Sequence, residues 1–326
     1  MQDTYHREIN YLRVSVTDRC NLRCVYCMPP EGVKLVPHDQ ILRNEEIARL
    51  VEAAALAGIK KVRLTGGEPL VRKGLVELVA AIGAIPGIDD IALTTNGLLL
   101  PEMGGELKRA GLRRVNISLD TLDPGLFRFI TGSGDLKQVW KGIEAALELG
   151  LHPVKINTVV MRGFNHHEIG DLAGLTLNHP LHVRFIELMP VGASDSWALD
   201  RHVPTPEVRE IIEAGLGELE DAHRPPGNGP ARYYRLPGAP GTIGFISAVS
   251  DHFCRRCNRL RLTAEGMIRP CLYSGREIDI KTPLRRGAGN SELAGLFAQA
   301  VKQKPDRHHI HGGWQDKKRI MSQIGG

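Results

Sequence analysis

The feature that most constrains this chain is a run of three cysteines near the N-terminus, Cys20, Cys24 and Cys27, with the spacing C-x₃-C-x₂-C. The run follows a strand-like segment, residues 11–16. Three thiolates this close can share one metal centre, whereas a structural zinc site closes itself with four protein ligands. An iron–sulfur cluster held by three cysteines leaves one iron open to an outside ligand. The run predicts such a cluster, with a zinc site or three buried thiols as the alternatives.

The chain has 326 residues and six cysteines, which fall into two triplets. Disulfides are rare in a reducing cytosol, so metal ligation explains this pattern better. The N-terminus carries no apolar run behind a basic patch, and no stretch reads as a membrane span, so we expect a cytoplasmic protein. The net charge of +5 suits a polyanionic small molecule. The sequence has no long Lys/Arg block of the kind that binds nucleic acid, so we expect no nucleic-acid partner.

The first part of the chain alternates strand and helix patterns without hairpin signals, which predicts a parallel sheet with right-handed crossovers. About six strand–helix units fall short of the eight of a full TIM barrel. We therefore expect an incomplete (β/α)₆ TIM-type barrel in residues 1–200 and a smaller C-terminal α+β domain in residues 201–326. The predicted strands are residues 11–16, 61–65, 91–95, 114–119, 154–160 and 183–188. The predicted helices between them are residues 44–58, 75–85, 102–110, 135–150 and 167–177.

Residues of unusual chemistry come directly after these strands, where parallel barrels place their active sites. The loops concerned are the Cys20 loop and residues 66–69, 95–97, 118–120 and 187–190. Lys155 and Asn157 alternate with apolar residues, so they share one face of their strand. We expect that face to be the barrel lumen; a solvated outer face is the alternative.

The second triplet is Cys254, Cys257 and Cys271, with the spacing C-x₂-C-x₁₃-C. A hairpin between residues 259 and 269 can bring Cys271 back beside the pair. Spacing alone leaves two interpretations open, a second iron–sulfur cluster or a zinc ribbon with His252 as fourth ligand.

Two arginines lie within this hairpin, Arg259 and Arg261. Alternate residues of a strand point to the same side, and guanidinium groups bind phosphate oxygens in a bidentate manner. An open iron beside two arginines resembles a nucleotide site. Two surface arginines on an exposed hairpin are the alternative.

With both triplets placed, the chain resembles the GTP 3′,8-cyclases of molybdenum cofactor biosynthesis, a family of the radical S-adenosylmethionine (SAM) superfamily. The resemblance covers nearly the whole length. It rests on residues 20–29, 63–69, 93–97, 118–120, 187–190, 243–274 and the terminal Ile324-Gly325-Gly326. Ala248, Arg255 and Arg256 depart from the family pattern, and the His-rich segment before Trp314 matches none that we know.

The resemblance implies a role for each matching residue. Cys20, Cys24 and Cys27 would bind the SAM cluster, and Cys254, Cys257 and Cys271 would bind a second [4Fe–4S] cluster that contacts guanine. The SAM pocket would be lined by Tyr26, Gly67, Glu68, Ser118 and Met189. The GTP contacts would be Arg13, Arg63, Thr94, Lys155, Arg259 and Arg261, with Lys61 a weaker candidate. The catalytic set would be Arg13, Arg259, Arg261, Gly325 and Gly326, the glycines forming a tail that reaches into the site.

The implied reaction converts GTP to (8S)-3′,8-cyclo-7,8-dihydroguanosine 5′-triphosphate. The radical derived from SAM removes hydrogen from C3′, and C3′ then bonds to C8 of the guanine. The implied next enzyme is cyclic pyranopterin monophosphate synthase. The sequence identifies no electron donor and leaves the oligomeric state open, with a homodimer as one option.

Two other functions compete with this one. The first is a radical SAM enzyme with an auxiliary cluster that modifies a peptide, although such enzymes usually carry longer, cysteine-richer C-terminal extensions. The second is a non-catalytic zinc-binding module that holds RNA through the basic hairpin. Product analysis with GTP separates the first from a cyclase, and metal analysis separates the second.

Overall fold

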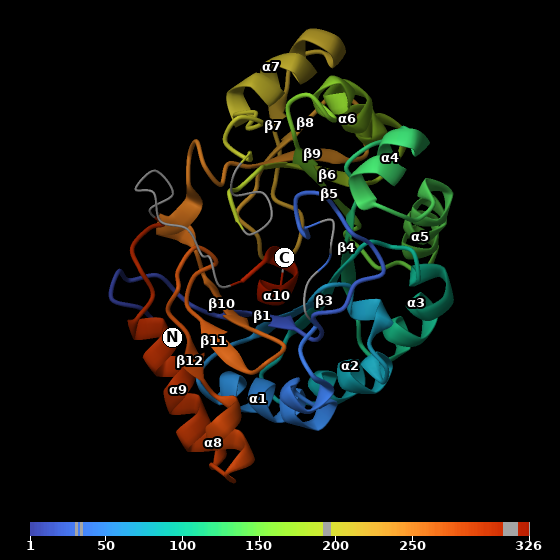
Figure 1. The fold of residues 1–326 in the computed structure, drawn as a ribbon. Coiled ribbons are helices and arrows are strands. Elements are labelled where there is room, and N and C mark those ends of the chain that lie inside the picture. The colour runs from blue at the N-terminus through green and yellow to red at the C-terminus, as the bar shows by residue number, and fades with distance from the viewer. Residues whose placement is uncertain (30–31, 33–34, 192–196, 309–318, 326) are drawn as a thin grey trace.

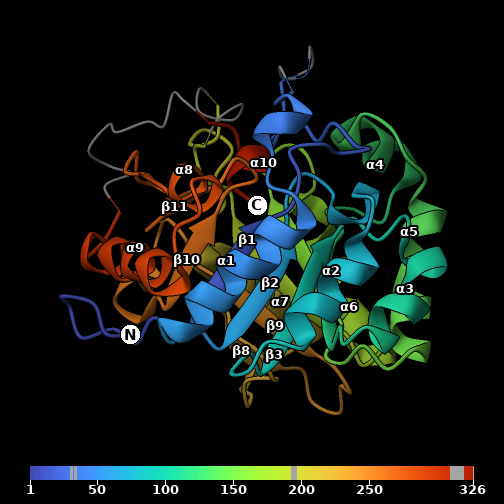
Figure 2. The ribbon, with the colours of Figure 1, turned by 90° about the horizontal axis from the view of Figure 1, so that it is seen from below.

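The computed structural model describes residues 1–29, 32, 35–191, 197–308 and 319–325. Within these residues, a 12-stranded sheet curves around a central space and helices cover its outer face (Figure 1). The short C-terminal helix α10 (Met321–Ile324) lies inside the curve. Figure 2 shows α10 near the end of the molecule where the segment after β1 also lies. Residues 321–324 therefore occupy the space inside the curve of the sheet.

The strand–helix alternation predicted for the first part of the chain is confirmed, with bounds shifted by a few residues. The six parallel strands are β1 (Tyr11–Ser15), β2 (Lys61–Thr65), β3 (Asp90–Thr95), β4 (Arg114–Ser118), β5 (Lys155–Val160) and β6 (His182–Glu187). The helices between them are α1 (Asn44–Leu56), α2 (Leu75–Gly83), α3 (Leu100–Arg109), α4 (Pro124–Thr131), α5 (Leu136–Glu148) and α6 (Ile169–Asn178). Asp135 caps α5, accepting from the N–H of Lys137.

The C-terminal part of the chain extends the same sheet at both of its edges. Strand β10 pairs in parallel with β1, and β9 pairs in parallel with β6, so the order is β12-β11-β10-β1-β2-β3-β4-β5-β6-β9-β8-β7. The remaining elements are α7 (Thr205–Leu216), β7 (Glu220–Asp221), β8 (Arg232–Arg235), β9 (Thr242–Ile246), β10 (Arg259–Leu262), β11 (Met267–Arg269), β12 (Ile278–Asp279), α8 (Lys281–Arg285) and α9 (Asn290–Lys302). The incomplete barrel is confirmed, and the later strands lengthen its curve. The boundary at residue 200 stays a prediction.

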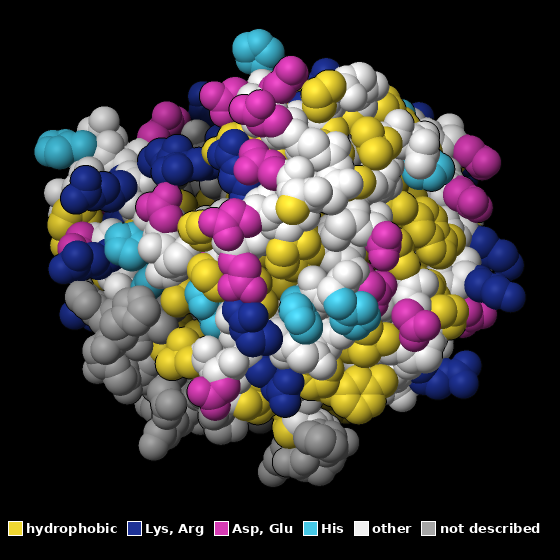
Figure 3. All heavy atoms as spheres, turned by 90° about the horizontal axis from the view of Figure 1, so that it is seen from above, with side chains coloured by type: hydrophobic (Ala, Val, Ile, Leu, Met, Phe, Trp, Pro, Cys, Tyr) yellow, Lys and Arg dark blue, Asp and Glu magenta, His cyan; other side chains and the backbone are white. Residues whose placement is uncertain are grey.

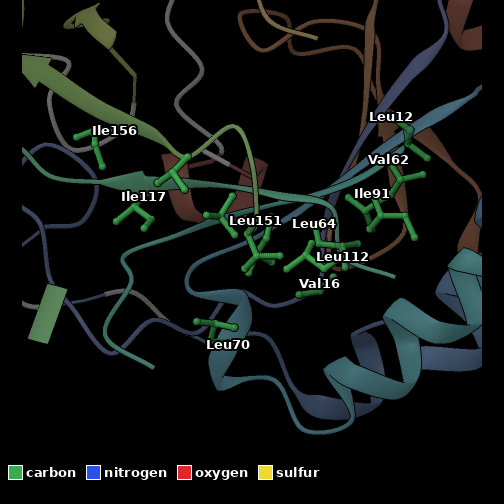
Figure 4. Close-up of a cluster of buried hydrophobic side chains, with 14 of the residues drawn as sticks. Leu12, Val16, Val62, Leu64, Leu70, Ile91, Leu112, Ile117, Leu151 and Ile156 are labelled. Carbon is green, nitrogen blue, oxygen red and sulfur yellow. The ribbon is translucent and has the colours of Figure 1, made fainter. Parts of the chain in front are cut away.

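The main hydrophobic core lies between the sheet and the outer helices. Side chains on one face of each strand are fully buried there, as Figure 4 shows for Leu12, Val62, Ile91, Ile117 and Ile156. Because side chains alternate across a strand, the residues between them face the enclosed space. The strands therefore carry apolar side chains outward and functional side chains inward.

No helix among the described residues is long and apolar enough to cross a membrane. The face of the molecule in Figure 3 mixes Lys and Arg side chains with Asp, Glu and hydrophobic ones. The arginines of the C-terminal hairpin do not form an exposed basic patch, since Arg261 is buried and Arg259 is half-buried. The surface-arginine alternative is therefore wrong.

A cavity lined by two cysteine triplets and buried cations

The first cysteine triplet lies in the loop after β1, at the C-terminal ends of the parallel strands. The chain turns between Cys24 and Cys27, where the Cys27 N–H donates to the Cys24 carbonyl at 2.9 Å. The loop after β2 packs against the start of this segment, because a Cβ on Gly67 would lie 2.2 Å from the Arg19 carbonyl oxygen. Only glycine allows so close a backbone approach. Gly67 thereby holds the entry to the Cys20 loop against the end of β2.

The thiols of this triplet are buried enough to favour the neutral form. Burial raises the pKa of Cys20 and Cys24, and it raises the pKa of Cys27 to about 12. The backbone N–H of Ser322, in α10, hydrogen-bonds the Cys27 sulfur. Metal ligation requires thiolates, so loading of this site must release protons.

The second triplet has a different electrostatic setting. Cys254 lies in a one-turn helix before β10, and Cys271 directly follows Pro270 after β11. Strands β10 and β11 form a hairpin, which brings Cys271 back toward Cys254 and Cys257. Burial raises the pKa of Cys257, but Arg259 and Lys304 outweigh it and bring the value down to about 6. One thiol of this triplet is therefore ionised near neutral pH before any metal binds.

Both triplets line the same cavity, of about 330 Å³. This volume lies in the usual range for small-molecule pockets. The lumen-facing residues of β1–β6 form its walls, and Met321 and Ser322 of α10 form part of its lining. The two cysteine motifs, more than two hundred residues apart in sequence, thus face the same cavity.

Each triplet supplies three thiols, a donor set that fits an iron–sulfur cluster with one iron left open. In the described part of the chain, no three His, Cys, Asp or Glu side chains are gathered closely enough to bind one ion. A four-iron cluster spreads its thiolates, since each binds a different iron. His252 is absent from the cavity lining and packs its ring 5.0 Å from that of His308. The geometry does not favour the zinc site with His252.

The five residues predicted for the SAM pocket all line the cavity beside the first triplet. They are Tyr26, Gly67, Glu68, Ser118 and Met189. The Tyr26 hydroxyl donates to Asp120 at 2.7 Å, and this carboxylate also accepts from the Val159 N–H at 2.8 Å. Burial raises the pKa of Asp120 to about 6. Asp120, which ends the Ser118–Asp120 motif, thus holds the Tyr26 side chain in place through its hydroxyl.

Glu68 is fixed in the cavity wall by three donors. Its carboxylate accepts from the N–H of Leu70 at 2.9 Å, from the hydroxyl of Thr95 at 2.7 Å and from the N–H of Asn96 at 2.7 Å. Burial outweighs these hydrogen bonds and raises its pKa to about 7. Glu68 joins the loops after β2 and β3 and presents a carboxyl group poised to change its charge near neutral pH.

The register of the sheet gathers arginines from three strands. Arg13 on β1 lies opposite Arg261 on β10 and Arg63 on β2, and Tyr11 lies opposite Arg259. Arg63 donates its Nε–H to the Tyr11 hydroxyl. Burial, followed by the charge of Arg259, lowers the pKa of Arg261 to about 9. Neighbouring cations are therefore packed side by side on the inner face of the sheet.

Most of these cations have no carboxylate partner. Among the described residues, no Asp or Glu forms an ion pair with Arg63, Arg184, Arg259 or Arg261. Buried charges are normally paired, because desolvation of an unpaired charge is costly. A cavity with this excess of positive charge is suited to a polyanionic ligand.

The remaining predicted GTP contacts lie at or just behind the cavity wall. The hydroxyl of Thr94 accepts from Arg63 at 3.3 Å. Lys155 is buried, so its strand face is not solvated, but it lies behind the lining and donates to the Pro226 carbonyl at 2.8 Å. Lys61 donates to Asn228 at 3.2 Å. The segment around Pro226 and Asn228 thus closes the N-terminal end of the barrel over both lysines.

The carbonyl of Gly325, near the C-terminus, lies beside two of the arginines. Its oxygen accepts from Arg13 Nε at 3.3 Å and from Arg261 Nη1 at 2.9 Å. Gly325 has φ of +80°, and a Cβ there would lie 2.9 Å from Thr65 Cγ2. Gly326 lies outside the described residues, as do the residues of the His-rich segment before Trp314 that follow His308.

Sequence reasoning missed two further cations that line the cavity. Arg184 on β6 donates to Asn157, and its alternation with Val183 and Phe185 was a signal that period two could have found. Lys304 follows α9 and has no such signal, because neither a motif nor a periodic pattern surrounds it.

Glu187 ties the end of β6 to the segment that leads into the second triplet. Its carboxylate accepts from the N–H groups of Thr205 at 2.9 Å, Val249 at 2.7 Å and Ser250 at 2.9 Å, with His202 Nε2 at 3.6 Å. Burial raises its pKa, but His202 and Ser250 outweigh burial and lower it to about 2. Glu187 therefore acts as an anionic anchor for these loops.

We expect Glu187→Gln to lower the free energy of unfolding by roughly 3 kcal/mol at neutral pH. A carboxylate with a depressed pKa stabilises the fold above its unfolded pKa of about 4.3, and this stability is lost as pH falls toward 2. Urea unfolding under anaerobic conditions at several pH values measures both effects. The exposed Glu52→Gln is the control. Identical acid dependence in Glu187→Gln and the unmodified protein would contradict the anchor.

Two family models match the chain. One is described as the Radical SAM superfamily and matches residues 14–176; the other is described as Molybdenum Cofactor Synthesis C and matches residues 181–310. Among similar proteins, the GTP 3′,8-cyclase of Pelotomaculum thermopropionicum is 65% identical over 326 residues, and that of Desulforamulus reducens is 57% identical over 326 residues. Each alignment covers 100% of both chains.

Solved structures of lower sequence identity share the fold. Streptococcus suis SuiB bound to S-adenosylmethionine matches with a TM-score of 0.60 and 16% identity, over 89% of this chain and 68% of that one. SuiB bound to its precursor peptide SuiA matches with a TM-score of 0.62 and 15% identity, over 89% and 66%. At this identity the likeness concerns the arrangement of strands and helices alone.

Proposed function

The chain belongs to the GTP 3′,8-cyclase family of the radical SAM superfamily, and from this premise we propose that its cavity performs the family reaction. The product is (8S)-3′,8-cyclo-7,8-dihydroguanosine 5′-triphosphate, which opens molybdenum cofactor biosynthesis. The observation that carries the proposal is a single cavity lined by two cysteine triplets and by buried cations that lack carboxylate partners. The peptide-modifying and zinc/RNA alternatives are not favoured.

Cofactor binding follows from the two triplets. Cys20, Cys24 and Cys27 would hold an iron–sulfur cluster, which would supply the one-electron reduction on which SAM cleavage depends. Cys254, Cys257 and Cys271 would hold a second [4Fe–4S] cluster on the substrate side of the cavity. The already ionised Cys257 favours metal loading there, since thiolates are the ligands.

The SAM-side residues orient one reactant. Glu68, held by three donors, presents a carboxyl oxygen to a cationic amino group, and Tyr26, held by Asp120, offers an aromatic face to a purine. Gly67 lets the loop after β2 lie close to the backbone of Arg19, next to the first triplet. Ser118 and Met189 complete this part of the cavity wall. Fixed groups hold the reacting carbon near its target without reorganisation.

The cation side binds the substrate. Arg13, Arg63, Arg259 and Arg261 face the same space and suit the oxygens of a triphosphate. The Gly325 carbonyl holds the Arg13 and Arg261 guanidiniums in a fixed orientation. Helix α10 lies inside the curve of the sheet and lines the cavity, where it takes up space that water would otherwise fill.

We expect GTP binding to take up about one proton at about pH 8. Burial and the nearby Arg184, Arg114 and Arg63 lower the pKa of Lys155 to about 6, so it is neutral in the free protein. A bound triphosphate favours the charged amine and raises this pKa. Affinity should then fall by up to about tenfold per pH unit above pH 6.

Calorimetry in buffers of different ionisation enthalpy, with SAM but without reductant, measures this proton uptake. Lys155→Met should bind GTP without it, and the exposed Lys137→Met should behave like the unmodified protein. Binding enthalpies that do not depend on the buffer in the unmodified protein would show that Lys155 stays neutral.

Anaerobic incubation with SAM, dithionite and GTP tests the function itself. We expect 5′-deoxyadenosine and a cyclised nucleotide together, from protein that holds about eight irons per chain. Unchanged GTP beside 5′-deoxyadenosine would favour another substrate, and a colourless zinc protein would refute the second cluster.

The family reaction also suggests the protein's surroundings. Its product requires a further enzyme, for which cyclic pyranopterin monophosphate synthase is our proposal. We place the protein in the cytoplasm, where thiols stay reduced. Gel filtration with and without GTP would test the homodimer that the sequence leaves open.

A further inference from the structure

One buried lysine outside both cysteine motifs connects two of the chain segments that carry the second triplet. Lys304 is 3% exposed and lines the cavity. Its Nζ donates to the carbonyl of Arg259 at 2.8 Å, two residues after Cys257, and to the carbonyl of Pro270 at 2.6 Å, directly before Cys271. Its third N–H has no partner among the described residues. A single ammonium group thus cross-links the backbones that carry two of the cysteines.

The residues after Lys304 are linked through Arg7 to the segment that carries the third cysteine, Cys254. Arg7 donates to the Cys254 carbonyl at 2.8 Å and, on the other side, to the carbonyls of Pro305 at 2.6 Å and Asp306 at 2.9 Å. Arg7 is itself fixed by a buried ion pair with Asp3, with Nε 2.6 Å from the carboxylate. The N-terminal segment therefore clamps Cys254 onto the chain that follows Lys304.

His308 completes these contacts. Its backbone N–H hydrogen-bonds the Cys254 sulfur, and its Nε2 donates to the Ala248 carbonyl at 2.9 Å. Its ring also packs edge-on against Tyr273, two residues after Cys271, at 6.0 Å. Residues 304–308, which we call the strap, thus touch the chain beside all three cysteines of the second triplet.

We propose that the strap positions the second cysteine triplet and that the charge of Lys304 raises the reduction potential of the cluster bound there. This inference rests on the second cluster of the proposed function. Hydrogen bonds and charges around a cluster are established determinants of its potential. Reduction adds a negative charge, which a nearby buried ammonium stabilises more strongly than an exposed one would. Lys304 is a positioning residue that acts through the cluster.

The cluster can be examined alone in full-length protein in which Cys20, Cys24 and Cys27 are all replaced by alanine. After anaerobic reconstitution, iron content and an EPR-monitored redox titration are measured for three further variants of this protein, Lys304→Met, Lys304→Arg and Lys302→Met. Lys302 is exposed at the end of α9, so its variant makes the same charge change away from the strap.

Lys304→Met should lower the ratio of reduced to oxidised cluster about tenfold at a fixed applied potential, a shift of about 59 mV for one electron. Lys304→Arg and Lys302→Met should stay near the parent value. If Lys304→Met retains no iron, restoration of the cluster in Lys304→Arg supports the proposal. Retained iron with an unchanged potential in Lys304→Met overturns it, as does equal loss of iron in the methionine and arginine variants.

The same experiment separates this proposal from the function on which it rests. If the parent triple-alanine protein binds zinc or no metal, the second cluster of the proposed function fails, whatever Lys304 does. If the parent binds about four irons and the strap variants leave both iron content and potential unchanged, only the strap proposal fails.

Discussion

Cys24→Ala should abolish SAM cleavage, by at least about a thousandfold, whereas Cys257→Ala should abolish only cyclisation. Cys24 belongs to the triplet whose loop lies beside Tyr26 and Glu68, so its loss removes the electron source for SAM. Cys257 belongs to the second triplet and lies beside Arg259, where we place the guanine. Without that anchor, the radical forms but finds no correctly held C3′. Quantification of 5′-deoxyadenosine and of cyclised nucleotide in the same reactions measures the two steps separately.

Iron analysis of the two variants provides the control for this experiment. Each variant should lose about four of about eight irons, which shows that the other cluster is intact. The unmodified protein without GTP gives the background rate of uncoupled SAM cleavage. Equal loss of both products in Cys24→Ala and Cys257→Ala would show that the triplets do not divide the work in this way.

Gly325→Ala should reduce product formation by at least about a hundredfold, and deletion of Gly325 and Gly326 should abolish it. The left-handed backbone at Gly325 strains any other residue, and a Cβ would press on Thr65 and on Ser15 Cβ at 3.3 Å. Either change displaces the carbonyl that orients Arg13 and Arg261. Because α10 and the cysteines remain, both clusters and GTP binding should persist. Product analysis, iron content and GTP affinity measure these three properties.

The control for the alanine variant is Gly287→Ala. Gly287 has φ of +89°, and a Cβ there would meet nothing within 4 Å. Gly287→Ala therefore has a similar strain in its backbone conformation but does not crowd the cavity. Its activity should stay within about twofold of the unmodified protein. A fully active deletion variant would remove the tail from the mechanism. Equal losses in Gly325→Ala and Gly287→Ala would indicate a general effect on stability.

The two triplets differ in a way that bears on how the metal centres are assembled. Cys24 and Cys27 have raised pKa values because they are buried among other thiols. The pKa of Cys257 is lowered, because Arg259 and Lys304 overcome the effect of burial. Cluster loading at the first triplet should therefore release more protons near neutral pH than loading at the second.

Much of the fold could be predicted from local sequence pattern. The six predicted strands of the barrel appear because runs such as residues 114–119 alternate apolar and polar side chains. Helix α4 and strand β8 were not predicted. The α4 sequence is short and begins with Pro124-Gly125, and β8 reads Arg-Tyr-Tyr-Arg within a Pro/Gly-rich stretch. Both are stabilised by packing on neighbours that the local pattern does not reveal.

The addition of β9 and β10 to opposite edges of the barrel was also beyond prediction. Each is a short strand whose partner could be any exposed edge. Pairing is decided by backbone hydrogen bonds between segments up to about 250 residues apart, such as Tyr11 opposite Arg259. Local propensity carries no information on such pairs.

By itself, the sequence determined the chemistry available to this protein: two sets of three thiols, a glycine-rich loop after β2, and arginines at alternate strand positions. Spacing and strand periodicity are short-range properties that one chain segment carries in full. The tertiary structure alone decided that both triplets share one cavity, that the Gly325 carbonyl lies between Arg13 and Arg261, and that Lys304 joins the arms of the second triplet. These contacts depend on the register of the sheet. They also depend on burial, because a buried cation needs hydrogen-bond acceptors and takes those that the fold places beside it.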